Sequence, residues 1–328
     1  MSSTGRGTVF GPLVIAYLFL GGAGAGACVL ASVVGLLVPA EEMTGAGGGW
    51  LEVPGEYRRL LAPPLVIAAG AVSVGVFCLI ADLGNPTAAL AILVNGLASW
   101  ANVGVVALVS CVAVSLLQLA LLEFVQGARV CLLRVLQVLG VVVGLVAAVY
   151  TGLLLGDMSG VPFWCSPWLP VLFAFSACNC GYALFTASAV LSGAHDFFAS
   201  ALSRFAPVSA LVILLEAAAL ACLVSLCGIG GGDAAVSTAS ASVTELLAGD
   251  LSTLFWMGAV FAGLLVPFAM ELLTMRSGEI SAYRSCVHVL VSVLFTLAGA
   301  LCLRYCVVMA GMHPYLGLLG VAGASLSL

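Results

Sequence analysis

Apolar runs of about 20 residues recur along the whole chain, and they restrict the possible folds more than any other feature. Each run is long enough to cross a hydrocarbon core of about 30 Å as a helix. Only helices and closed barrels satisfy their backbone hydrogen bonds in lipid, and these runs are too long and too uniformly apolar for barrel strands. Charged residues make up 7% of the 328 residues, whereas a soluble domain carries about 25%. We therefore predict an all-α integral membrane protein.

Eight membrane spans are predicted, and together they form a single polytopic membrane domain over 1–328. Their expected bounds are about 11–38, 62–82, 99–125, 131–156, 168–193, 206–229, 251–275 and 286–311. The first half of the domain covers about 11–156, and the second half covers about 168–311. The segments 39–61 and 230–250 are predicted to be long loops.

The first span contains the small-residue run GGAGAGA. A cleavable signal peptide is not expected there, because the apolar run continues too far beyond these residues. We predict instead a retained first helix. Its glycines at positions 21, 22, 24 and 26 would allow a neighbouring helix to approach backbone to backbone.

The arginines give an expected orientation in the membrane. Seven of them fall in or beside loops 1, 3, 5 and 7, namely Arg58, Arg59, Arg129, Arg134, Arg204, Arg276 and Arg284. The other side has Arg6, and Arg304 lies late in the last span. By the positive-inside rule, the odd-numbered loops are cytoplasmic and both termini lie on the outer, periplasmic side of a bacterial cell membrane.

This orientation brings polar and aromatic residues of the first half to the outer face. They are Tyr17, Asp82, Trp100, Tyr150, Asp157 and Trp164. A tyrosine hydroxyl can donate a hydrogen bond to a carbonyl group, and a nearby carboxylate can move the proton. A quinone head group needs both functions, together with an apolar channel for its tail. The alternative is that these aromatic residues belong to the interfacial belt of a membrane protein.

Ionisable residues inside a membrane span are rare and are functional by default. Glu216 lies near the middle of the sixth span, where it is either bonded to a neighbouring helix or part of a proton relay. Asp82, at the lip of the second span, is either an exposed interfacial acid or a proton acceptor for a ligand. Glu123 and Glu271 lie near cytoplasmic ends, where their side chains are expected to reach water. Arg304 needs either an acidic partner or the outer interface.

No metal site, haem or iron–sulfur cluster is expected in this protein. Most of the 12 cysteines lie singly in apolar spans, and the pair Cys178 and Cys180 has no second pair at metal-site spacing. The three histidines are scattered over both faces and one span, so they do not supply two axial haem ligands from facing helices. Any electrons must therefore leave through a partner. The protein has no lysine and a net charge of −5, which excludes nucleic acid as a partner.

Several stretches, taken in sequence order, match the motifs of one membrane family. They are AYLFLGGAGAGACVLAS at 16–32, ADLGNPTAALAIL at 81–93, SWANVGVVAL at 99–108, YTGLLLGDMSGVPFWCSPWLPVLFAFSACNCG at 150–181, LFWMGAVFAGLLVPFAMELL at 254–273 and LCLRYCVVMAG at 301–311. In these stretches the protein resembles the NrfD-type polysulfide reductase membrane subunits over nearly its whole length.

The resemblance implies an eight-helix membrane anchor, with both termini outside, for a molybdopterin oxidoreductase complex. An iron–sulfur subunit would dock on the anchor and exchange electrons with a catalytic molybdenum subunit. The anchor would bind menaquinol near its outer face through the first-half helices, and Tyr150 matches the family's tyrosine of the fourth helix. One departure is that Asn85 precedes Pro86 where the family often has arginine, so Asp82 lacks a local counter-charge.

The sequence therefore favours a quinol-binding membrane subunit that is not a complete enzyme alone. Catalytic roles are predicted for Tyr150, Asp82 and Glu216, and contacts to the head group for Tyr150, Tyr17, Trp100, Asp157 and Trp164. The iron–sulfur partner is expected to dock where the outer segments 157–167 and 230–250 are exposed. Two alternatives stay open: a proton-coupled small-solute transporter that uses Glu216 and Asp82, and a structural anchor with a degenerate quinone site. The absence of an internal repeat counts against the transporter.

Overall fold

The computed structural model describes residues 11–44, 49–83, 100–125, 128–157, 161–194, 198, 204–228, 234–276 and 282–325. In these ranges the protein is built from helices, and eight of them are long and apolar enough to cross a membrane. The predicted all-α membrane bundle is thereby confirmed at the level of its architecture.

The helices follow one another in the order that the apolar runs predict. The first half consists of α1 (Pro12–Leu37), α2 (Gly55–Leu83), α4 (Trp100–Glu123) and α5 (Val130–Gly156). A short 3-10 turn, η1 (Ala40–Met43), follows α1. The second half consists of α6 (Trp168–Leu191), α8 (Ala206–Gly228), α9 (Ala234–Ala248), the π-helical η2 (Leu254–Leu265), α10 (Val266–Arg276) and α11 (Ala282–Ser325). The segments η2 and α10 together make one span, Leu254–Arg276.

Three boundaries differ from the prediction. Helix α2 begins at Gly55, because a polar turn with Glu56 precedes the apolar run and the proline pair of that run lies inside the helix. The segment 230–250 is predicted to be a loop, but most of it forms α9. This helix forms because Val243 and Leu246 are buried where α9 packs on α8 and α11. Helix α11 continues to Ser325, beyond the expected end of the last span.

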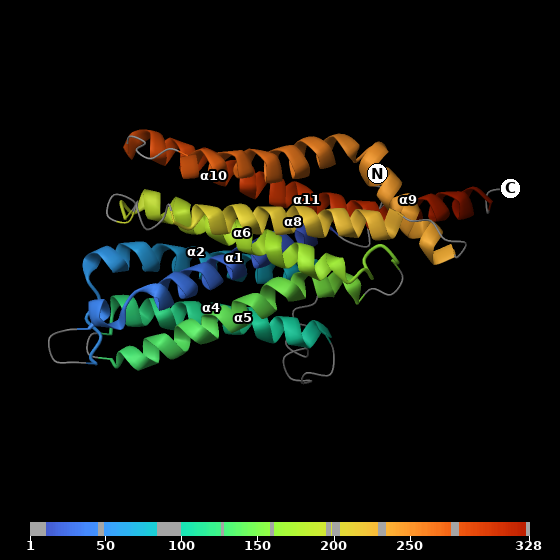
Figure 1. The fold of residues 1–328 in the computed structure, drawn as a ribbon. Coiled ribbons are helices and arrows are strands. Elements are labelled where there is room, and N and C mark those ends of the chain that lie inside the picture. The colour runs from blue at the N-terminus through green and yellow to red at the C-terminus, as the bar shows by residue number, and fades with distance from the viewer. Residues whose placement is uncertain are drawn as a thin grey trace, which may run out of the picture.

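The spanning helices lie side by side along a common direction (Figure 1). We call the end that carries the start of α1, the start of α6 and the end of α11 the even-loop end. The opposite end, with the starts of α2 and α8, is the odd-loop end. The start of α1, the end of α11 and the helix α9 therefore share one end of the bundle. The side of the membrane to which each end belongs stays a prediction from the arginines.

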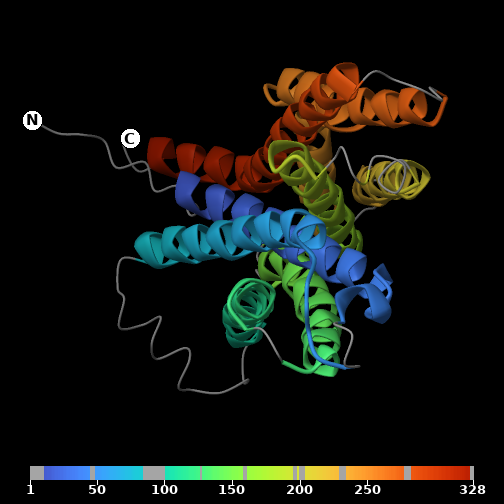
Figure 2. The same ribbon diagram turned by 90° about the vertical axis from the view of Figure 1, so that its left-hand side faces the viewer.

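Helices α1 and α6 form the centre of the bundle. Helix α1 packs against α2, α5 and α6, while α6 packs against α1, α5, α8 and α11. Viewed along the bundle, α2, α4 and α5 lie on one side of this pair, and α8, α10 and α11 lie on the other (Figure 2). Residues that α1 and α6 contribute can therefore connect the two halves of the protein.

The two central helices touch backbone to backbone, as the glycines of the first span predict. A Cβ atom added to Gly26 would overlap the carbonyl group of Ala177, and one added to Gly181 would overlap the carbonyl group of Gly26. Without a hydrophobic driving force in lipid, helices associate through such close packing. Glycine at both positions thus sets the distance between α1 and α6.

Candidate functional site

Two buried tyrosines from different helices lie together toward the even-loop end. Tyr17 of α1 is 0% exposed and Tyr150 of α5 is 2% exposed. The Tyr17 hydroxyl interacts electrostatically with that of Tyr150, and it makes no hydrogen bond of standard geometry within the described part of the protein. A residue of the interfacial belt has an exposed ring. The belt interpretation is therefore wrong for both tyrosines, and the structure brings these two candidates together.

A glycine of a third helix makes room for the Tyr150 ring. A Cβ atom added to Gly104 of α4 would fall on the ring atoms of Tyr150. On the other side, the Tyr17 ring lies against Gly21, whose added Cβ atom would be 3.7 Å from Tyr17 Cε2. The pair of phenol rings is thus held in a slot between α1, α4 and α5 that small residues define.

Replacing Gly104 by alanine should displace the Tyr150 ring, because the new methyl group and the ring cannot occupy the same space. Overpacking of this kind costs about 1–3 kcal/mol. The midpoint of thermal unfolding of the detergent-purified protein should fall accordingly. Gly70→Ala is the matched control, since nothing lies within 4 Å of a Cβ atom added at that position on α2. Equal midpoints for the two variants would contradict the described slot.

The nominated acids of the first half lie at the same end but are exposed. Asp157 is the C-cap residue of α5, and it acts electrostatically on Tyr150. Asp82 lies near the end of α2 beside Gly11, whose added Cβ atom would be 2.7 Å from the Asp82 carboxylate. Gly11 is the N-cap residue of α1, and a carboxylate is favourable at a helix N-terminus. Trp100 is the first residue of α4, but its side chain lies outside the described residues.

Trp164 is buried, although it belongs to the segment 157–167 that is predicted to be exposed. Its side chain is 1% exposed, and the indole Nε1 donates a hydrogen bond of 3.0 Å to the carbonyl oxygen of Val307 in α11. Gly311 leaves room for the ring, because a Cβ atom added there would overlap the indole. This hydrogen bond attaches the segment between α5 and α6 to the last helix, α11. Trp164 therefore holds the even-loop end together.

Arg304 is fully buried. The sequence leaves open whether this arginine has an acidic partner or reaches the outer interface, and its burial excludes the outer interface. Its Nε donates to the carbonyl oxygen of Leu18 at 3.1 Å, and its Nη1 donates to Ser176 Oγ at 3.1 Å and to the carbonyl oxygen of Ala300 at 3.0 Å. The rings of Phe19 and Phe173 lie 5.9 and 5.3 Å from the guanidinium carbon. Cation–π contacts of this kind are favourable in a desolvated site.

Glu216 shares this buried region with Arg304. The carboxylate is 3% exposed, and it accepts a hydrogen bond of 3.0 Å from Asn179 Nδ2. It interacts electrostatically with Arg304 and with Ser176, which also receives a hydrogen bond from Arg304. The nominated Glu216 is thus placed in the second half, within a cluster formed by α6, α8 and α11. The tyrosine pair belongs to a separate cluster in the first half.

One peptide unit of α1 connects the two clusters. Arg304 binds the carbonyl group of Leu18, the residue that follows Tyr17. A Cβ atom added to Gly22 would lie 2.7 Å from Arg304 Nη2, so this glycine admits the guanidinium group against α1. Sequence reasoning missed Arg304 as a structural centre. The available signal was the presence of an arginine inside an otherwise apolar span.

Glu271 is buried, although its side chain is expected from the sequence to reach water. Its side chain is 7% exposed and accepts a hydrogen bond of 3.2 Å from Ser209 Oγ, so it does not reach water. Glu123, by contrast, is about one-third exposed and forms a salt bridge of 3.7 Å with Arg58. The difference arises because Glu271 faces α8 across the α8–α10 contact.

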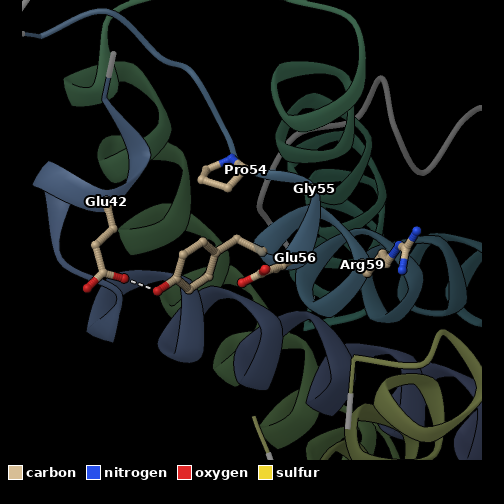
Figure 3. Close-up of a pocket in the computed structure, with 6 residues that line it drawn as sticks. Glu42, Pro54, Gly55, Glu56 and Arg59 are labelled. Carbon is tan, nitrogen blue, oxygen red and sulfur yellow. Dashed lines mark hydrogen bonds between the residues drawn. The ribbon is translucent and has the colours of Figure 1, made fainter. Parts of the chain in front are cut away.

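A pocket of about 550 Å³ opens at the odd-loop end, where the chain passes from η1 to the start of α2 (Figure 3). Its lining residues are Glu42, Pro54, Gly55, Glu56, Tyr57 and Arg59. Tyr57 donates a hydrogen bond to Glu42, and Arg59 points away from the two carboxylates. None of the nominated site residues lines this pocket, and its charged, open surface is typical of a solvated helix end.

Comparisons with known proteins extend over nearly the whole sequence. A family model described as "Polysulphide reductase, NrfD" matches residues 2–314. The protein is 25% identical to a polysulfide reductase chain of Wolinella succinogenes over 313 residues, covering 91% of the present sequence and 92% of that relative. It is 28% identical to protein NrfD of Escherichia coli over 324 residues, covering 92% of the present sequence and 93% of that relative.

Proposed function

The chain belongs to the polysulphide reductase NrfD family, and from this membership we propose that it is the membrane anchor and quinol-binding subunit of a multi-subunit oxidoreductase. The name of the relative from Wolinella succinogenes describes it as one chain of polysulfide reductase, which supports a role within a complex. The proposed substrate is menaquinol. The proposed partners are an iron–sulfur subunit and a molybdopterin subunit, as the sequence resemblance implies.

The observation that carries the quinol site is the buried pair of tyrosines beside exposed acids. The Tyr150 hydroxyl bonds an oxygen of the head group, and Tyr17 from the facing helix completes the polar wall of the site. Asp157, at the exposed end of the same helix as Tyr150, receives the proton and passes it to water. Apolar surfaces of α1, α4 and α5 accommodate the tail.

Access to this site requires movement of side chains. Because Tyr150 is 2% exposed, a ligand that contacts its hydroxyl must displace neighbours in the slot. A ligand offsets such a rearrangement with its own binding energy, and a binding-competent state with a small population lowers the apparent affinity.

The electrons leave at the even-loop end in this proposal. Quinol oxidation releases two electrons and two protons, and the acceptor is the iron–sulfur subunit docked on α9 and the turns around 161–167. Cys165 of these turns is exposed, whereas Trp164 is buried and serves to hold the docking segment in place.

Replacing Tyr150 by phenylalanine should weaken quinol binding about tenfold, which corresponds to the loss of one hydrogen bond of about 1.4 kcal/mol. The measurement is a fluorescence-quenching titration of the purified protein with a menaquinol analogue. Tyr305→Phe is the matched control, because Tyr305 is 38% exposed on α11 and faces away from the core.

Equal affinities in the Tyr150→Phe and Tyr305→Phe variants would remove the tyrosine pair as the site. Without saturable binding in the unmodified protein, the quinol proposal fails as a whole. The protein would then be a structural anchor, or a transporter that uses Glu216 for proton coupling.

A further inference from the structure

Two connecting segments are joined by their backbones at the odd-loop end, and each contributes one exposed side chain there. Trp50, between η1 and α2, forms an antiparallel bridge with Arg129, the N-cap residue of α5. Two backbone hydrogen bonds flank this pair, from Leu51 N to Ala128 O at 2.7 Å and from Val130 N to Gly49 O at 3.1 Å. Because no hydrogen bond joins the pair itself, its two side chains lie closer together than those of a hydrogen-bonded pair.

The local sequence explains why Trp50 points outward. Gly49 has a φ of +90°, which residues with a side chain rarely adopt, and this turn brings its carbonyl group to the start of α5. Successive side chains of an extended segment point to opposite sides. Leu51 is 3% exposed and fills the core position, so Trp50 faces outward and is 53% exposed. The backbone therefore holds this indole at the surface.

The guanidinium group of Arg129 lies over the indole and is not neutralised by an acid. Its carbon atom is 6.0 Å from the centroid of the Trp50 ring, and the side chain is exposed. In the described part of the protein, the salt bridge of this end joins Arg58 to Glu123, and the exposed Glu52 forms none with Arg129. Arginine presents five donors in a planar fork that matches a phosphate group. The ring therefore positions a cation that no described carboxylate occupies.

Other arginines of the bundle lack this combination. Arg134 donates to the carbonyl oxygen of Gly35 at 2.6 Å near the C-terminus of α1, where a cation is favourable. Arg276 is exposed at the end of α10, but no aromatic ring of the described residues lies at cation–π distance from it. An exposed guanidinium group with an attached indole thus distinguishes Arg129 from these two arginines.

An exposed apolar stripe of α5 leads from Arg129 into the membrane. Helix α5 packs against α1, α4 and α6, and the stripe consists of residues that are between 43% and 53% exposed, namely Leu132, Val135, Leu139 and Val142. They are three or four positions apart and therefore share one face of the helix. From the first to the last of them the helix rises about 15 Å, half of a hydrocarbon core of about 30 Å. The stripe thus has the length of one acyl chain.

We propose that Arg129, Trp50 and the stripe on α5 form a binding site for one anionic phospholipid. The guanidinium group binds the phosphate of the head group through charge-assisted hydrogen bonds. The indole lies at the level of the head group, where the amphipathic ring of tryptophan is favourable, and an acyl chain lies along the stripe. A zwitterionic lipid carries the same phosphate, but its ammonium group cancels the net charge that Arg129 attracts. This site goes beyond the proposed quinol function and does not depend on it.

Native mass spectrometry of the full-length protein in detergent, titrated with phosphatidylglycerol, tests the role of the cation. Arg129→Gln should weaken the tightest binding of this lipid about tenfold, because a charge-assisted contact is lost. Arg129→Lys keeps the charge without the fork and should give a smaller loss. Arg276→Gln is the matched control, since it removes one exposed charge at the same end, and it should leave the affinity unchanged. Equal affinities of the Arg129→Gln and Arg276→Gln variants would overturn the site.

Fluorescence quenching in nanodiscs locates the lipid, because bromine quenches a tryptophan that it contacts. The signal of Trp50 is the difference between the unmodified protein and the Trp50→Phe variant. Phosphatidylglycerol brominated near the top of its acyl chains should quench this signal more than phosphatidylcholine brominated in the same way, and Arg129→Gln should remove the difference.

Inorganic phosphate in excess separates a lipid from a free anion. It should leave the quenching of Trp50 unchanged, because free phosphate has no chain for the stripe to hold. Reversal of the quenching by inorganic phosphate would overturn the lipid as the ligand. Equal quenching by the two brominated lipids in the unmodified protein would overturn the preference for an anionic head group.

Discussion

Replacing Gly26 by leucine should abolish the folded protein. The first atom of the new side chain would occupy the position of the Ala177 carbonyl group, and both partners in this clash are helix backbone. Neither helix can move away without opening the contact of α1 with α6 on which the other helices pack. We expect a loss of about 4 kcal/mol or more, which is exceptional for a single substitution.

The measurement for this variant is the yield of monodisperse protein after detergent extraction. Gly70→Leu is the matched control, because it makes the same chemical change on α2 where nothing lies within 4 Å of the added Cβ atom. We expect the control to be within about 0.5 kcal/mol of the unmodified protein. A normal yield of the Gly26→Leu variant would show that α1 and α6 do not cross as described.

Replacing Arg304 by methionine should give the second large loss of stability, about 3–5 kcal/mol, as when one partner of a buried charged pair is removed. The substitution keeps a long side chain but removes the donors to Leu18 and Ser176 and the positive charge that acts on Glu216. The midpoint of thermal unfolding in detergent is the measurement. Arg276→Met at the exposed end of α10 is the control and should leave the midpoint unchanged.

A double substitution separates the charge from the packing. Glu216→Gln combined with Arg304→Met removes both buried charges, so the double variant should be more stable than Arg304→Met alone. The expected coupling energy is about 1–3 kcal/mol, the range for residues in one network. Strictly additive losses would mean that Arg304 acts only through its hydrogen bonds to α1 and α6.

Hydropathy predicts where the helices lie, because the free energy of apolar segments in lipid depends on composition alone. The same signal misses α9, whose sequence AAVSTASASVTELLA is rich in small polar residues. That helix forms because Val243 and Leu246 pack on other helices, which is a tertiary effect. Hydropathy also misses the early start of α2, because the first turn of this helix is charged.

Chemical type identifies the candidate residues in the sequence, but it does not identify their partners. Tyr17 and Tyr150 are separate candidates in the sequence, and their contact depends on the glycine of α4 that admits the Tyr150 ring. The bonds of Arg304 reach residues 286 and 128 positions away, and no local pattern encodes such distances. The prediction that Glu271 reaches water is wrong, because position along a span predicts depth in the membrane, and depth does not reveal which side faces another helix. For the same reason the sequence does not show that Trp164, in a segment predicted to be exposed, packs on α11.

The bond between Arg304 and Leu18 also sets an order of events during synthesis. Of the described spans, α1 with the acceptor is synthesised first, and α11 with the donor is synthesised last. Until α11 enters the membrane, the Leu18 carbonyl group on α1 and the Ser176 hydroxyl on α6 have no guanidinium donor. The packing of α1 and α6 around this buried cation can therefore be completed only after α11 has been translated. A protein truncated before position 304 would lack the buried cation that α11 supplies to α1 and α6.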